Sequence, residues 1–500
     1  MAARTEVAGA AAYAAVGVAE LLWDESRHPL GAGWRVVAKK ELAPGTVVVR
    51  EIGCAVAASE SGAICPVCFD MHTSTQEESE LAPCRALAAR EQRILAPLMQ
   101  AGLFDELQAY GVDRQLVLLW LRVINLAATT SDDLPAPAAA RLQAWRDTLW
   151  GLAHQDVSAP SDTWLNGVTM AAVVLVQGLP PAVVAAATDL LLPLVQQSSH
   201  GESSGSLVEV LVLLAGMLNR NGYSVRAARE PNRETAWGHF PVIALVNHSC
   251  HPNCAVVSRP GGELEVRTLG TVRAGAELFV SYVDLTLPRA ERQAHLLASK
   301  EFTCTCYRCQ HPDAFPHEHE ASMPSCPQCG LALRWTQTSA SGKDDTETAT
   351  CYSDAGGCGA VVTASAVQSR LTEAREALSQ AGEPSAVADV VGSLLPEEHA
   401  LVMQARLRLF ARLNKDEAHR EGAQEQLAKV AASLSRLVPT LWPELLEFEW
   451  LALRSAHALA CEGDQSDASR LNSRLTALRS RAERIFGLGH PFVEQLQFST

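Results

Sequence analysis

The sequence lacks an apolar run long enough to cross a membrane. A membrane-spanning helix needs about 20 consecutive apolar residues. The segment Leu207–Leu218 is shorter and contains Glu209, and the run that begins at Val168 is interrupted by Gly178-Leu179-Pro180-Pro181. Residues 8–23 are apolar and alanine-rich like a signal peptide, but an acidic residue precedes them and the start is only weakly basic. We therefore expect neither membrane association nor secretion.

The sequence also lacks an excess of positive charge. It has 41 Lys and Arg against 56 Asp and Glu, which gives a formal net charge of −15. Binding to duplex DNA needs clustered cations that neutralise phosphates, so we expect no direct nucleic-acid binding. An acidic protein suits a basic peptide as its partner, although many soluble proteins are acidic. No basic nuclear signal stands out, and we expect the cytoplasm, the nucleus or both as the compartment.

The composition describes a globular protein with more than one domain. Its 500 residues exceed what one hydrophobic core usually holds, so two or three domains are expected. Hydrophobic residues make up 48% of the chain and charged residues 19%, which is not the composition of a disordered protein. The 14 cysteines fall mostly into short-spaced clusters. In a chain of this size, such clusters indicate zinc ligands in a reducing compartment rather than disulfides.

Hydrophobic periodicity predicts alternating strand-rich and helix-rich regions. Residues 34–57 alternate valine with polar or small residues around Pro44-Gly45, which predicts a strand, a turn and a second strand. Leucines recur largely at helical spacing over 85–128, and residues 138–218 are again mostly helical. Strands return over 239–282, so the predicted helices form an insertion between two strand-rich segments.

The second strand-rich segment carries turn signals. The residues Pro260-Gly261-Gly262 separate Ala255–Ser258 from Leu264–Val266, which predicts a hairpin. The pair Ala274-Gly275 predicts another turn, followed by a strand over Glu277–Ser281.

The last 200 residues begin with a cysteine-rich segment and continue as helices. Residues 304–358 show little periodicity, and we expect bound metal to replace a hydrophobic core there. Five helical patterns follow, which suggest a tetratricopeptide-like array without a clean repeat motif. They cover residues 366–380, 396–413, 419–437, 441–461 and 467–486.

Three short motifs carry the functional information. They are Asn-His-Ser-Cys-His-Pro-Asn at 247–253, Glu-Leu-Phe-Val-Ser-Tyr-Val-Asp at 277–284, and Cys-Thr-Cys-Tyr-Arg-Cys at 304–309. All three stand in this order within about sixty residues. This arrangement resembles the catalytic end of a SET-domain protein-lysine methyltransferase.

The order of elements along the chain resembles the SET-and-MYND branch of these enzymes. The chain has a Gly-Ala-Gly start at 31–33, a cysteine insertion, a helical insertion, the Asn-His-Ser-Cys loop, the tyrosine strand, the cysteine tail and C-terminal helices. Asn221-Gly222-Tyr223-Ser224-Val225 also resembles a segment that precedes the catalytic strands in one SET branch. The similarity is strongest over 207–309 and weak over 130–205.

The resemblance implies an α+β architecture: a SET-domain fold of short strands with a helical insertion, zinc modules and a helical C-terminal domain. The domains we expect are the N-terminal SET part (25–60), a degenerate MYND-like insertion (61–85), the helical insertion (86–206), the catalytic SET part (207–286), a post-SET and zinc-ribbon-like region (287–362), and the helical C-terminal domain (363–500).

The implied reaction transfers a methyl group from S-adenosylmethionine to a protein lysine. Free lysine has a pKa near ~10.4, so its ammonium must lose a proton on entering the site. A neighbouring sulfonium and a dry channel both favour the neutral amine, so no strong base is required. Oriented oxygens complete the site, and the resemblance assigns the catalytic hydroxyl to Tyr282. The residues implied to bind the cofactor are Gly31, Ala32, Gly33, Asn221, Asn247, His248, Tyr282 and Phe302.

The cysteines suggest several metal sites. The resemblance implies that Cys250 joins Cys304, Cys306 and Cys309 around one structural zinc. The pairs Cys326/Cys329 and Cys351/Cys358 are spaced like a zinc ribbon, although the second pair is wide.

Two departures from the family pattern stand out. Ala32 replaces the basic residue usual between the first glycines, which puts cofactor affinity in doubt. The MYND finger needs eight ligands, and only Cys65, Cys68, His72 and Cys84 are found; either they bind zinc or they form a leftover loop with free thiols.

The sequence therefore leaves three alternative functions open. We expect a monomeric lysine methyltransferase that acts on a histone or another protein. A SET scaffold that has lost cofactor affinity would instead be an adaptor whose C-terminal helices bind a partner. A purely structural zinc protein would have no cavity beside Asn247 and Tyr282.

Overall fold

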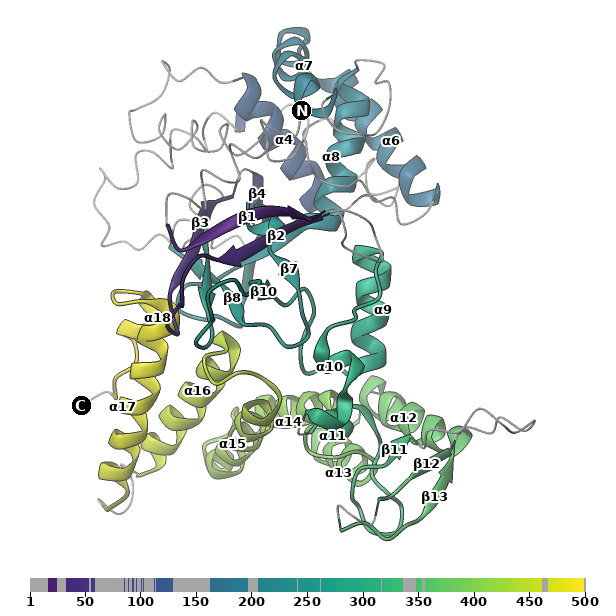
Figure 1. Ribbon diagram of the computed structural model, residues 1–500, viewed down its shortest axis with the longest axis vertical. Coiled ribbons are helices and arrows are strands. Elements are labelled where there is room, and N and C mark those ends of the chain that lie inside the picture. The colour runs from purple at the N-terminus through teal and green to yellow at the C-terminus, as the bar shows by residue number, and fades with distance from the viewer. Residues whose placement is uncertain are drawn as a thin grey trace.

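The computed structural model describes most of the chain. The described residues are 17–24, 33–53, 55–58, 114–128, 162–196, 206–240, 242–260, 262–315, 317–335, 348–352, 356–380, 382–460 and 466–498, with a few single positions between 85 and 112. Small sheets lie at the centre, a helical layer covers one end, and an array of helices covers the other (Figure 1).

The central strands come from both sides of the helical insertion. β1 pairs with β2, β3 with β9 and β9 with β8, and β4 with β6 and β6 with β5, all antiparallel; β7 and β10 are parallel. Their bounds are β1 Ala19–Asp24, β2 Gly33–Ala38, β3 Val47–Ile52, β4 Ala55–Ala58, β5 Gly222–Arg226, β6 Glu234–His239, β7 Asn247–His248, β8 Cys254–Arg259, β9 Glu263–Thr268 and β10 Phe279–Val280.

These strands share one core because the two halves interleave. Val36 and Val48 from the first half pack with Phe240, Val266 and Leu278 from the second, and all five are buried. The central packing of these strands therefore comes from residues on both sides of the insertion.

The predicted hairpin is confirmed, and the strand predicted after it is too long. In the hairpin, Ser258 of β8 stands opposite Leu264 of β9. Only Phe279–Val280 form β10, because the residues before it pair with β2 instead: Glu277 bridges Val37, and the Leu278 N–H donates to the Val36 carbonyl at 2.8 Å.

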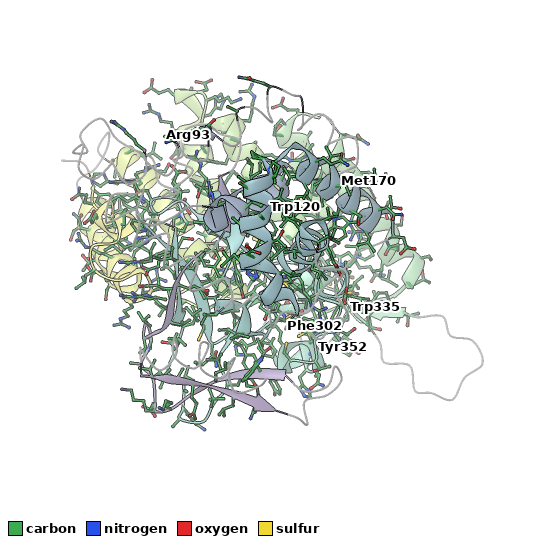
Figure 2. The ribbon with its side chains drawn as sticks, turned by 90° about the horizontal axis from the view of Figure 1, so that it is seen from above. Arg93, Trp120, Met170, Phe302, Trp335 and Tyr352 are labelled. Atoms are coloured by element: carbon green, nitrogen blue, oxygen red, sulfur yellow. The ribbon has the colours of Figure 1, made fainter. Side chains whose placement is uncertain are left out.

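The described helices of the insertion have a core of their own. Trp120 is fully buried there among leucines and valines of the other helices (Figure 2). The predicted break at Pro180-Pro181 is confirmed, and the Ser206 side chain caps the last helix by accepting from the Glu209 N–H at 3.3 Å. The helices are α4 Arg114–Ala128, α6 Asp162–Gly178, α7 Pro181–Gln196 and α8 Leu207–Asn221.

Helix α8 passes directly into β5, and this junction positions the site. A Cβ at Gly222 would lie 2.3 Å from the Trp237 ring, so glycine is required there. Asn221 is thereby held at the end of α8, directly before β5.

The cysteine-rich region is built from short elements. They are α9 Arg289–Lys300, α10 Tyr307–Gln310, α11 Glu318–Ser322, β11 Arg334–Trp335, β12 Thr348–Thr350 and β13 Val361–Thr363. Helix α9 was not predicted from the sequence. The 3₁₀ helices of the chain are η3 Ile243–Leu245, η4 Pro312–Ala314 and η6 Glu417–His419.

The C-terminal helices form an array in which each of α12–α17 packs against the next along the chain (Figure 1). All five predicted helical patterns are confirmed, and α13 was missed. The bounds are α12 Ala364–Ser379, α13 Pro384–Leu394, α14 Ala400–Leu413, α15 Arg420–Leu437, α16 Pro443–Ala460, α17 Ser466–Phe486 and α18 Pro491–Glu494. None of the helices in the described ranges combines the length and apolarity that crossing a bilayer demands.

Two buried clusters join this array to the centre. Ala255 and Val257 of β8 pack against Leu446 and Trp450 of α16. The cysteine tail packs against α15 and α16 through residues such as Leu434. The C-terminal helices are therefore packed directly against the strands and the cysteine tail that follow the insertion.

Candidate active site

Two motifs that are thirty residues apart in sequence lie side by side. Phe279 stands opposite Asn247 and Val280 opposite His248 in a short parallel pair. Asn253 holds this arrangement: its amide donates to the Glu277 carbonyl and its oxygen accepts from the Phe279 N–H, both at 2.8 Å. Asn253 thereby fixes the exit of the 247–253 loop against the second motif.

Tyr282 lies directly against the bend at 246–248. Its main-chain N–H donates to His248 Nδ1 at 3.0 Å, and its hydroxyl donates to the Val246 carbonyl at 2.7 Å. The His248 and Tyr282 ring centroids are 5.3 Å apart. Because the Tyr282 hydroxyl donates its hydrogen bond to the Val246 carbonyl, the phenol oxygen can act toward other groups only as an acceptor.

His248 links this bend to the first cysteine cluster. Burial lowers the pKa of His248 to about 4, so the ring is neutral at pH 7. Because Nδ1 accepts from Tyr282, the ring proton belongs on Nε2, which lies 3.3 Å from Cys250 Sγ. The ring also packs against Phe302, with centroids 6.0 Å apart.

Asn247 ties three segments together through its side chain. Its Nδ2 donates to the Trp34 carbonyl at 2.6 Å and to Glu277 Oε1 at 2.9 Å. Both amide protons are therefore used within the chain. The amide oxygen remains as the side-chain atom of Asn247 with which a cofactor contact is proposed.

A cavity of about 730 Å³ opens beside these residues. Asn221, Asn247, Tyr282 and Phe302 line it from the SET side. Apolar residues of the C-terminal helices line the opposite side: Met403, Leu407, Val430, Leu434, Val438, Trp442 and Phe448. A purely structural zinc protein predicts no cavity at this place, so the cavity argues against that interpretation.

The structure brings together most of the residues predicted to bind the cofactor. Gly33 opens β2 beside Trp34, which accepts the bond from Asn247. Asn221 donates to the Met217 carbonyl at 3.2 Å and lines the cavity. Gly31 and Ala32 lie outside the described residues.

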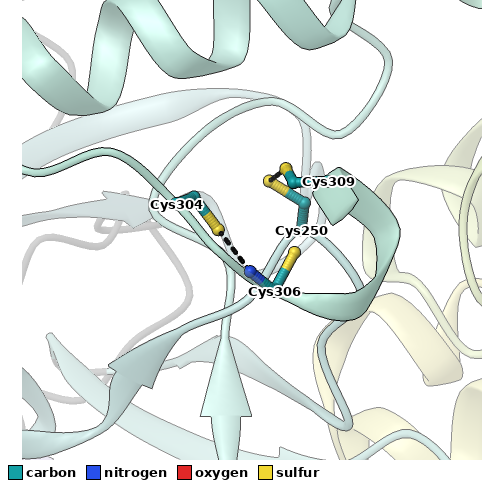
Figure 3. Close-up of side chains that lie close together, drawn as sticks. All are labelled: Cys250, Cys304, Cys306 and Cys309. Atoms are coloured by element: carbon teal, nitrogen blue, oxygen red, sulfur yellow. Dashed lines mark hydrogen bonds between the residues drawn. The ribbon is translucent and has the colours of Figure 1, made fainter. Parts of the chain in front are cut away.

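The first cysteine cluster has the geometry of a tetrahedral metal site (Figure 3). The sulfurs of Cys250, Cys304, Cys306 and Cys309 lie within 4.8 Å of one another, and those of Cys250 and Cys309 are 3.6 Å apart. Four thiolates at the usual Zn–S distance of about 2.3 Å would be about 3.8 Å apart. These residues therefore fit zinc, with the His248 Nε2–H beside one ligand as an outer-shell donor.

A buried ion network supports this cluster. Glu318 contacts Arg292 and Arg308, each at 2.6 Å, and all three are buried. Arg308 also donates to the Cys250 and Leu285 carbonyls, both at 3.2 Å. The network connects α9, α10 and α11 to the chain on either side of Tyr282.

The second cluster also fits zinc. The sulfurs of Cys326, Cys329, Cys351 and Cys358 lie within 4.8 Å of one another, with Cys329 and Cys358 exposed. The predicted finger residues Cys65, Cys68, His72 and Cys84 lie outside the described residues.

Comparison with known proteins decides the family. A model of the SET domain matches residues 33–283. The chain belongs to the SET-domain family. This SET protein is 36% identical over 124 residues to the N-lysine methyltransferase SMYD2 of Homo sapiens, covering 25% of this chain and 28% of that one. It is 38% identical over 137 residues to SMYD2 of Sus scrofa, covering 27% and 30%. The alignments thus span less than a third of these relatives.

Two solved structures are also similar to this SET protein. One is the SET domain of LSMT bound to lysine and AdoHcy, with 12% identity, a TM-score of 0.22, and coverage of 95% of this chain and 85% of that one. The other is Rubisco LSMT bound to AdoMet, with 12% identity, a TM-score of 0.27, and coverage of 96% and 86%.

Sequence reasoning missed three charged residues around the site of this SET protein. Glu51 on β3 accepts from the Val242 and Ile243 N–H groups, at 3.0 and 2.8 Å through Oε2, and so holds the segment that leads to Val246. Burial raises the pKa of Glu51 to about 8. Glu318 is buried between two arginines. Lys300 lines the cavity. The sequence signal that could have indicated this is its position two residues before Phe302.

Proposed function

We propose that this SET protein is an S-adenosylmethionine-dependent protein-lysine N-methyltransferase. The substrate is a lysine side chain of a histone or another protein. The observation that carries the proposal is the position of Tyr282, whose main chain and hydroxyl are both bonded to the 246–248 bend beside an open cavity. The similarity to N-lysine methyltransferases over the matched segment supports it.

The residues around the cavity suit the deprotonation that the reaction needs. A lysine ammonium entering a site lined by Met403, Leu434 and Phe448 loses hydration, which lowers its pKa. The Tyr282 oxygen and nearby main-chain carbonyls then orient the neutral amine as acceptors. When bound, S-adenosylmethionine supplies the electrophilic methyl group.

The proposed cofactor residues are Gly31, Ala32, Gly33, Asn221, Asn247, His248, Tyr282 and Phe302, with Tyr282 also catalytic. Zinc at the first cysteine cluster would hold the chain after Tyr282 in place, because Cys250 follows the Asn247-His248 pair and Phe302 precedes Cys304. We also propose that zinc binds at the remnant finger Cys65, Cys68, His72 and Cys84, with a leftover loop of free thiols as the alternative.

The apolar wall of the cavity that α14–α16 provide is compatible with a peptide substrate. A lysine presented on a chain can enter beside Tyr282 while its neighbours contact the apolar side chains of this wall. We propose that the protein acts as a monomer without direct nucleic-acid binding. Thiolate-rich metal sites favour a reducing compartment, so we propose the cytoplasm, the nucleus or both.

Two measurements test this function. Calorimetric titration with S-adenosylmethionine should show binding to the folded, zinc-loaded protein. Labelled cofactor should then transfer methyl to lysines on a protein or peptide array. A folded protein that binds no cofactor refutes the enzyme and favours the adaptor.

A further inference from the structure

Lysine is scarce in this chain, and one of its few lysines stands in the cavity. There are six lysines against 35 arginines. Lys300 ends α9 and lines the cavity with Asn247, Tyr282 and Phe302. The others are Lys39, Lys40 and Lys415, which are exposed, Lys429, which pairs with Glu425, and Lys343, which lies outside the described residues.

The local backbone directs Lys300 into this place. Glu301, the residue that follows, has φ +58°, so the chain turns sharply at the end of α9. Glu301 is held there by Arg220, with 3.0 Å between the charged atoms. Lys300 and Phe302, on either side of this turn, both line the cavity.

The Lys300 amine lies beside the proposed reacting centre. Its Nζ is 5.5 Å from the centroid of the Tyr282 ring. It donates to the main-chain carbonyl of Arg220, directly before Asn221. Within the described ranges no carboxylate forms an ion pair with it, so the amine is positioned by this hydrogen bond to a neutral acceptor and by its contact with the Tyr282 ring.

The environment also favours the nucleophilic form of this amine. Burial, and secondarily the charge of Arg220, lower the pKa of Lys300 to about 8. About half of the amine is then neutral at pH 8, whereas an ordinary lysine with a pKa near ~10.4 is below about 1% neutral. A four-carbon stem allows the nitrogen to leave the Arg220 carbonyl and turn within the cavity.

We propose that Lys300 is a methyl acceptor of its own active site. This inference rests on the proposed function. The neutral Lys300 Nζ attacks the sulfonium methyl, a C–N bond forms as the S–CH₃ bond breaks, and the sulfur keeps the bonding electron pair. The products are methyl-lysine at position 300 and S-adenosylhomocysteine, and the proton of the amine passes to solvent.

The test follows the mass of the whole protein and of its peptides. Purified full-length protein is incubated at pH 8 with S-adenosylmethionine carrying a deuterated methyl group, and the six lysines are then mapped by mass spectrometry. We expect label at position 300. Its first-order rate constant should stay within about twofold over a tenfold range of protein concentration, because acceptor and site belong to one molecule.

Two variants and a binding measurement separate the alternatives. Lys300→Arg should lose the label, while the matched control Lys429→Arg should keep it. Calorimetry with S-adenosylmethionine on both variants reports cofactor binding without turnover. Binding without label at position 300 overturns this inference and leaves the proposed function standing. A label whose rate constant rises with protein concentration also overturns it, whereas absence of cofactor binding overturns both proposals.

Discussion

Replacing Tyr282 by phenylalanine removes one oxygen and keeps the ring. The lost group is the hydroxyl that donates to the Val246 carbonyl at 2.7 Å. If this oxygen orients the reacting amine, the rate of methyl transfer should fall about 10²-fold or more, which corresponds to about 2.7 kcal/mol of transition-state stabilisation.

The same substitution should affect stability much less. One hydrogen bond in a half-buried place contributes about 1 kcal/mol, and the Tyr282 main-chain bond to His248 at 3.0 Å is unaffected. The fall in the methylation rate should therefore be larger than the fall that a smaller fraction of folded protein would cause. That difference separates a catalytic hydroxyl from a structural one.

The assay is steady-state methylation of a peptide substrate at saturating cofactor. Equal losses in kcat and in kcat/KM indicate an interaction made only in the transition state. Tyr307→Phe is the matched control, because Tyr307 is 61% exposed and does not line the cavity. A Tyr282→Phe enzyme with a rate within about twofold of the unmodified protein refutes the role of the hydroxyl.

Three further predictions concern the surroundings of the site. Cys309→Ser, or chelation of zinc, should lower Tm by about 10 °C in a melting experiment, because metal substitutes for a core in this segment; an unchanged Tm with zinc still bound contradicts the assigned ligand set. Glu318→Ala should destabilise the fold by about 3–5 kcal/mol in denaturant titration, because it leaves the buried Arg292 and Arg308 without their partner. The raised pKa of Glu51 means that the folded state binds more protons than the unfolded state between about pH 4.5 and 8. Its stabilising contribution is thus complete below about pH 4.5 and is lost, on the order of 5 kcal/mol, as pH rises through about 8. Glu51→Gln should flatten this part of the stability profile, and an identical profile in the variant contradicts the assignment.

The parts of the site that could be predicted depend on short sequence patterns. The motifs at 247–253 and 277–284 are each continuous in the sequence. The short spacing of Cys304, Cys306 and Cys309 marks them as candidate metal ligands, whereas Cys250 was added by the family resemblance. The hairpin and the helical array follow from turn residues and from period, which are local properties.

The parts that were missed depend on contacts across the chain. Glu51 is recognisable only once β3 lies under residues 242–243, 191 positions later. Lys300 lies at the site because α8 meets the end of α9. Helix α9 itself has a strongly charged sequence with few apolar positions. Strand β10 is short because the residues before it pair with β2. Such pairings are settled by tertiary structure and leave little trace in local pattern.

The far side of the cavity belongs to helices that begin more than a hundred residues after Tyr282. A fragment ending near residue 283 would keep the family signature and yet expose to water the strand surface that now meets Trp450. Substitutions in the carboxy-terminal third of the chain can accordingly change selectivity for the proposed peptide substrate while the motif residues stay the same.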